Sequence, residues 1–294
     1  MKIKELKNEI IKNFMKYKYV NFSIILVTLI ICVCIIMVNE TKDYQNNYVS
    51  KNSENLQSSP VNDETDKIFL ERPDRTKEYK EAYAKNKDTV GWIYIPGTTI
   101  DWPVMQGVNN DYYLRKNEEK EYAFDGCIFG DDDSVFSPFK MLSNNLVIHG
   151  HNLDDNPEGK RFAQLVKFQN KEFAENTPYI FLTTADEQLV YEIYAVFFTD
   201  VKFGYNRTDL DKDLQQFMIN SAKKRSEYIY DVDVTGLDKL ITLSTCTYKY
   251  GAYGSVGQKN TRFVVQGKLL KTKDALKPKA SLTKNMNPEA PHIN

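Results

Sequence analysis

Three residues at the ends of apolar runs have side chains that could do chemistry together. Cys246 closes a run that ends in Thr-Leu-Ser-Thr-Cys, His151 follows a second run, and Arg262 opens a third. Short apolar runs bounded by polar residues indicate buried strands, and a side chain at the end of such a strand can face a cleft. A thiol beside an imidazole is an activated nucleophile, and a guanidinium can hold the oxyanion that forms when a carbonyl is attacked. These residue types therefore predict acyl transfer from an amide to a thioester and then to a second nucleophile.

The cysteine also has simpler interpretations. Cys246 alone would fit a buried strand cysteine that packs as a small apolar side chain, and the presence of His151 and Arg262 is what favours catalysis. Cys127 is the other cysteine outside the apolar N-terminal segment, so a disulfide with Cys246 is arithmetically possible. Such a bridge would consume the nucleophile, and two cysteines in a domain of this size do not form a disulfide framework.

Two groups of residues raise the question of a metal ion. His149 and His151 stand two residues apart, which on a strand places both on one face at a spacing found in zinc sites. The sequence offers no evident third ligand, so we interpret His149 as a structural neighbour and predict no metal. The acidic runs 131–133 and 154–155 would suit calcium, and solvated loop acids are the simpler interpretation. The chain has no glycine-rich phosphate loop and no cofactor fingerprint, so we expect no cofactor.

The N-terminal segment predicts a membrane anchor. Residues 20–38 are apolar and uncharged, which is about the length that spans a bilayer as a helix. Lysines outnumber acidic residues before this run, which places residues 1–19 in the cytoplasm and the rest outside the cell. A cleaved signal peptide is the alternative, but Met37-Val38-Asn39-Glu40 is a poor cleavage site. We expect a single-pass protein of the cell membrane with an extracellular catalytic domain.

Composition divides the remainder of the chain into three parts. Residues 39–65 are polar and rich in Asn, Ser, Lys and Asp, which is typical of a flexible tether. Residues 66–270 form the expected catalytic domain, with a helical flank at 66–89. Residues 271–294 have few apolar side chains and are expected to be a disordered tail. The formal net charge is −1 and no basic face interleaves with aromatic residues, so nucleic acid is not expected as a partner.

The catalytic part has the pattern of a mainly β domain with helical insertions. The runs that predict strands are 92–95, 100–105, 127–129, 146–149, 179–183, 189–198, 240–245 and 262–269. Helical spacing occurs at 162–168 and again at 210–228, where Leu214, Phe217, Met218 and Ala222 fall on one face. Many short strands with two helical insertions favour a closed or nearly closed barrel.

Taken together, the motifs resemble those of the sortase family. Thr242-Leu243-Ser244-Thr245-Cys246 followed by Arg262 is similar to the sortase signature, and Gly150-His151 is similar to the segment that carries the sortase histidine. Four further segments resemble class B sortases: Val90-Gly91-Trp92-Ile93, Asp101-x-Pro103-Val104, Asn110-x-x-Tyr113-Leu114 and Gly126-Cys127-Ile128-Phe129. The loop 247–261 looks longer than is usual for the class, and Cys127 stands where class B members often have serine.

The resemblance implies an eight-stranded sortase barrel with N-terminal helices. It implies a cysteine transpeptidase that cleaves a Pro-x-Thr type of sorting motif after the Thr, forms a thioacyl-enzyme, and joins a secreted protein to a peptidoglycan amine. Cys246, His151 and Arg262 would be catalytic, and Ser244 and Thr245 would line the substrate cleft. A cysteine endopeptidase and a pilin-polymerising sortase are the alternative activities, and a catalytically silent surface-binding domain is a third possibility.

Overall fold

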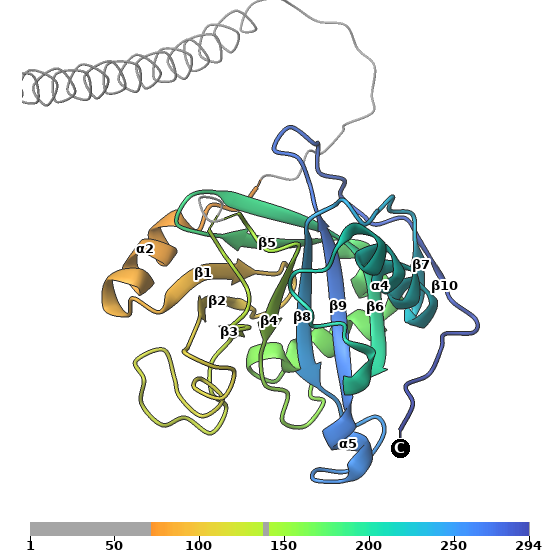
Figure 1. Ribbon diagram of the computed structural model, residues 1–294, viewed down its shortest axis with the longest axis horizontal. Coiled ribbons are helices and arrows are strands. Elements are labelled where there is room, and N and C mark those ends of the chain that lie inside the picture. Colours follow the sequence, from red (N-terminus) through yellow and green to blue (C-terminus); the bar gives the residue numbers. More distant parts are fainter. Residues whose placement is uncertain (1–71, 138–140, 294) are drawn as a thin grey trace, which may run out of the picture. The chain divides into compact units, whose positions relative to one another are not determined.

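The structure is a computed structural model that describes residues 72–137 and 141–293, and its elements form one closed barrel with helices around it (Figure 1). The strands are β1 (Thr89–Tyr94), β2 (Asp101–Met105), β3 (Phe129–Gly130), β4 (Asn145–His149), β5 (Tyr179–Thr183), β6 (Gln188–Asp200), β7 (Tyr228–Tyr230), β8 (Leu240–Cys246), β9 (Thr261–Leu269) and β10 (Leu282–Lys284). The helices are α2 (Thr76–Lys85), α3 (Lys171–Asn176), α4 (Lys212–Arg225) and α5 (Val256–Asn260), with 3₁₀ segments η2 (Arg161–Gln169) and η3 (Val201–Phe203).

The barrel closes in the order β1-β2-β3-β4-β8-β9-β6-β5, which confirms the prediction of eight strands. β4 runs parallel to β8, and β8 runs antiparallel to β9. β5 and β6 form the expected hairpin, closed by a hydrogen bond from Thr184 N–H to the Glu187 carbonyl at 2.9 Å. Three strands, β4, β8 and β9, therefore bring the ends of distant sequence segments to one edge of the barrel.

Alternation along β8 determines which side chains face which side of the sheet. Ile241 and Leu243 belong to the main apolar core inside the barrel, and Leu240 belongs to a second core cluster that includes residues of α4. Because successive strand residues point to opposite faces, Ser244 and Cys246 share the face of Leu240. The Cys246 thiol therefore lies on the outer side of the barrel wall.

Helix α4 covers this outer side beside β6 (Figure 1). Its first turn is capped by the Asp211 carboxylate, which accepts from the N–H of Asp213 and Leu214, and its last turn is basic. Met218 and Ala222 are buried as expected, but the predictions for Leu214 and Phe217 are wrong, because these residues are 46 % and 68 % exposed. The buried face is instead completed by Ile219 and by the polar Gln215.

The C-terminal segment differs from the expected disordered tail. β10 pairs antiparallel with β7, and Leu276 and Leu282 are buried. Glu289 forms an ion pair with Arg225 of α4. Sparse apolar residues are sufficient for an ordered segment here because Leu276 and Leu282 pack in apolar clusters with residues of the barrel strands.

The remaining differences concern length and helix type. The predicted strand 127–129 is a two-residue strand, β3, and the predicted helix 162–168 is the 3₁₀ segment η2. The predicted cytoplasmic tail, membrane anchor and tether, residues 1–65, lie outside the described residues, as does the start of the helical flank. No helix among residues 72–137 and 141–293 is long and apolar enough to cross a membrane.

Candidate active site

The sheet register brings the three predicted catalytic residues to one cavity. Cys246 lies opposite Arg262 in the β8–β9 pair, and His151 follows β4, the other neighbour of β8. All three line a cavity of about 370 Å³. The other residues that line it are Asn110, Asp111, Leu114, Phe129, Asp131, His149, Gly150, Val201, Tyr205, Asn206, Ser244 and Thr245.

Cys246 is a free, half-buried thiol at the last position of β8. The chain around it is held by neighbours from the loop after β4. Asn152 donates to the Cys246 carbonyl at 3.0 Å, and Thr245 Oγ1 donates to the Gly150 carbonyl at 2.7 Å. Cys127 is also free, so the alternative of a disulfide with Cys246 is wrong. Burial raises the pKa of the Cys127 thiol far above its ordinary value, which makes it a poor nucleophile.

His151 is fixed from one side by a backbone carbonyl. Its Nε2 lies 2.8 Å from the Leu114 carbonyl oxygen, so Nε2 carries a proton and donates. Burial lowers the pKa of His151, partly offset by the Leu114 carbonyl, so the resting imidazole is neutral at pH 7. Gly150 is required by close packing, because a Cβ there would lie 2.7 Å from Cγ of Phe162.

Arg262 is held by the loop that precedes it. Nη1 donates to the carbonyls of Lys259 at 2.9 Å and Thr261 at 2.8 Å. Lys259 belongs to α5, the short helix that forms within the long loop after Cys246, and the Ser255 hydroxyl caps it by accepting from Gln258 N–H. The long loop therefore has a structural role that the sequence did not indicate, which is to fix the guanidinium beside β8.

The two predicted substrate-binding residues have different surroundings. The hydroxyls of Ser244 and Tyr205 are 3.0 Å apart, on the face of β8 that carries Cys246. The Thr245 hydroxyl instead bonds the Gly150 carbonyl on the other face, so only its backbone side is directed to the cavity. Tyr205, which follows β6 and η3, was missed because nothing in its local sequence marks it.

His149, interpreted from the sequence as a structural neighbour, lies at the same cavity. It lines the cavity, its Nε2 lies 2.9 Å from Oδ2 of Asp131, and its ring packs on Phe129. Burial raises the pKa of Asp131, but hydrogen bonds from His149, the N–H of Asp133 and Asn110 bring it below its usual value. Asp131 is therefore ionised at neutral pH.

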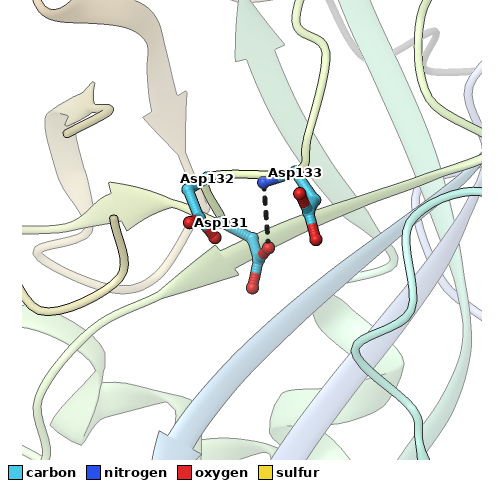
Figure 2. Close-up of side chains that lie close together, drawn as sticks. All are labelled: Asp131, Asp132 and Asp133. Carbon is cyan, nitrogen blue, oxygen red and sulfur yellow. Dashed lines mark hydrogen bonds between the residues drawn. The ribbon is translucent and has the colours of Figure 1, made fainter. Parts of the chain in front are cut away.

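The acidic run beside this pair is the one group of potential metal ligands among residues 72–137 and 141–293, with its ligand atoms within 4.8 Å of one another. Figure 2 shows that Asp131 accepts a hydrogen bond from the backbone of Asp133. Asp132 and Asp133 are exposed, and Asp131 is engaged with His149. The second acidic run serves loop structure, since the Asp155 carboxylate accepts from the N–H of Tyr248 at 2.8 Å.

The surroundings of the cavity can support acyl transfer. The Cys246 thiol can attack a carbonyl, and the neutral His151 imidazole can receive and return a proton. The Arg262 guanidinium, on the neighbouring strand and the same face of the sheet, can donate to the oxyanion. No group in this arrangement requires a metal or a cofactor for that chemistry.

Comparison with known proteins agrees with this geometry. Residues 93–270 match the family model of the sortase domain. Sortase B of Listeria monocytogenes is 36% identical over 196 residues, which cover 66% of this chain and 74% of the relative. A Staphylococcus aureus sortase B-substrate complex has a TM-score of 0.58 at 30% identity, over 67% of this chain and 87% of that one. Sortase B of Clostridium perfringens has a TM-score of 0.57 at 30% identity, over 65% and 99%.

Proposed function

Because this chain belongs to the sortase family, class B, and is a cysteine transpeptidase, we propose that Cys246, His151 and Arg262 are its reacting groups. The observation that carries the assignment is their convergence on one cavity from three different strand ends. The register between Cys246 and Arg262 places thiol and guanidinium on the same face of the sheet.

The first half of the reaction is acylation of Cys246. His151 takes the thiol proton as the sulfur attacks the carbonyl of the motif threonine, and Arg262 donates to the oxygen as it becomes negative. The imidazolium then gives its proton to the departing amine, and the C–N bond breaks as the thioester forms. The low pKa of His151 suits this step, because a weakly basic imidazole returns its proton readily.

The second half is transfer of the acyl group to a peptidoglycan amine. We propose that the substrate is a secreted protein with a C-terminal sorting motif of the Pro-x-Thr type, cut after the Thr. The backbone and hydroxyl of Ser244 and the backbone of Thr245 contact this motif beside Cys246. A structural neighbour is a Staphylococcus aureus sortase B-substrate complex, which supports substrate binding by this fold.

The location proposed for the enzyme is the outer face of the cell membrane. It rests on the sequence: an apolar uncharged span at 20–38, a lysine excess before it, and a polar tether after it. In this arrangement residues 1–19 are cytoplasmic and the catalytic domain meets its substrates during export. Protease protection of intact and permeabilised cells tests it, and digestion of the N-terminal tail in intact cells would exclude this orientation.

Product analysis tests the reaction itself. Full-length protein in detergent is incubated with candidate motif peptides, with and without a stem-peptide amine, and the products are identified by mass spectrometry. An amide adduct with the amine supports transpeptidation. Cleavage without an adduct under any acceptor indicates an endopeptidase, and transfer only to a lysine of a second substrate protein indicates a pilin-polymerising enzyme.

A further inference from the structure

The cavity holds a second imidazole that acylation does not use. Nε2 of His149 lies 2.9 Å from Oδ2 of Asp131, and both residues line the same cavity as Cys246. The side chain of Asp131 is only 6% exposed, while that of His149 is 21% exposed. The carboxylate is therefore nearly enclosed, and the imidazole is the more exposed of the two groups.

Strand register places this imidazole on the side of the sheet where the thioester forms. His149 pairs with Ser244 in the parallel β4–β8 ladder, so its side chain shares a face with Ser244 and Cys246. One strand across and two residues along corresponds to roughly 8 Å between the Cα atoms of His149 and Cys246. Side chains at that separation can contact one small molecule between them.

Proton counting shows what transfer must remove from the incoming amine. After acylation His151 is neutral again, because the thiol proton has left with the departing amine. An incoming alkyl amine is an ammonium ion at neutral pH, and it loses two protons when it becomes an amide nitrogen. One of these restores the Cys246–His151 pair, and the other leaves either to solvent or to a second base in the cavity.

We propose that His149, held by Asp131, accepts the first proton of the incoming ammonium, while His151 handles the second. The inference rests on the proposed function. The N–H bond of the ammonium breaks and its proton goes to the His149 ring; the free amine then attacks the thioester carbonyl and the C–S bond breaks. The amine's second proton passes through His151 to the sulfur of Cys246, and the imidazolium of His149 releases its proton to water.

The partners of the pair suit this role. Asp131 Oδ2 bonds Nε2 of His149 and thereby fixes the tautomer, which leaves Nδ1 as the acceptor nitrogen. Among residues 72–137 and 141–293, no hydrogen bond occupies Nδ1 of His149. Asn110 donates to the same carboxylate at 3.1 Å, and the N–H of Asp133 donates to its other oxygen. A carboxylate held in this way stabilises the imidazolium that forms in front of it.

The test compares two acceptors that differ in their need for a base. Triglycine arrives mainly as an ammonium ion at pH 7, whereas hydroxylamine is already neutral. Full-length wild type, His149→Gln and Asp131→Asn are each given a motif peptide with one acceptor or the other. The rate of thioester formation and the rate of each transfer product are followed by mass spectrometry.

We expect His149→Gln to lose up to roughly tenfold in transfer to triglycine at pH 7, because about a tenth of its α-amino groups are already neutral there and need no base, and to retain transfer to hydroxylamine. Asp131→Asn should shift the ratio of the two products in the same direction. Equal losses with both acceptors would overturn the proposal in favour of a structural role. Full activity of the variants with both acceptors would overturn it as well, because the ratio of the two products would then be that of wild type. Failure of the proposed function is distinguishable, since wild type would then form no thioester with any motif peptide.

Discussion

Replacement of Thr245 by valine tests how the catalytic edge of the barrel is held. The buried Thr245 hydroxyl donates to the Gly150 carbonyl at 2.7 Å, which ties the last residues of β8 to the turn that presents His151. Valine has the same shape but no donor, so the buried Gly150 carbonyl would lose its partner. Leaving a buried acceptor unsatisfied costs about 1–3 kcal/mol.

For a domain of this size that loss corresponds to a decrease in Tm of about 2–12 °C. Thr245→Ser keeps the hydroxyl and removes only a methyl group, so it is the matched control and should be the more active variant. Thermal unfolding and turnover of a motif peptide are measured for both. A valine variant as stable and active as wild type would refute the argument that this bond positions His151. If the serine variant lost more activity than the valine variant, the methyl group would be what matters.

Four further outcomes follow from the site. Cys246→Ala should abolish turnover while the free energy of unfolding changes by no more than about 1–2 kcal/mol; cleavage near the wild-type rate would exclude the assignment. His151→Ala should abolish formation of the thioester on Cys246 and therefore transfer to every acceptor. His149→Ala should still form the thioester, and steady-state kinetics of the two variants distinguish them. Arg262→Lys should lower the turnover rate by roughly 10²-fold, because lysine lacks the planar guanidinium that the carbonyls of Lys259 and Thr261 hold in place. A near-normal rate would mean that only the positive charge of Arg262 matters. Burial lowers the pKa of His151 in the folded state, so the unfolded state binds a proton at this histidine first as the pH falls. The free energy of unfolding should therefore decrease as the pH falls below about 6.5. Denaturation at several pH values should show a smaller decrease in His151→Gln than in wild type.

Strand ends could be located from sequence because the determining pattern is local. The apolar runs before Cys246 and His151 are continuous, and their lengths matched β8 and β4 closely. Arg262 was identified in the same way, at the start of β9. What the runs could not supply was register, and register is what places Cys246 opposite Arg262 and His149 beside Ser244.

The features that were missed depend on contacts between distant segments. Asp131 reads as one of three loop acids until the fold brings it to His149, 18 positions away along the chain. Tyr205 reaches the cavity from the segment after β6, and α5 forms in a loop whose tyrosines and glycines predict no helix. The C-terminal segment is poor in apolar residues, and its order comes from the strand and helix it contacts.

Intact-mass analysis of the acylated enzyme tests the central claim most directly. Full-length protein is mixed with a motif peptide in the absence of an amine acceptor, quenched in acid, and digested to locate the adduct. The predicted result is one acyl group, corresponding to the peptide up to its threonine, attached to Cys246 and released by hydroxylamine. Cleaved peptide without any adduct on Cys246 in wild type, or an adduct that persists in Cys246→Ala, would contradict the account.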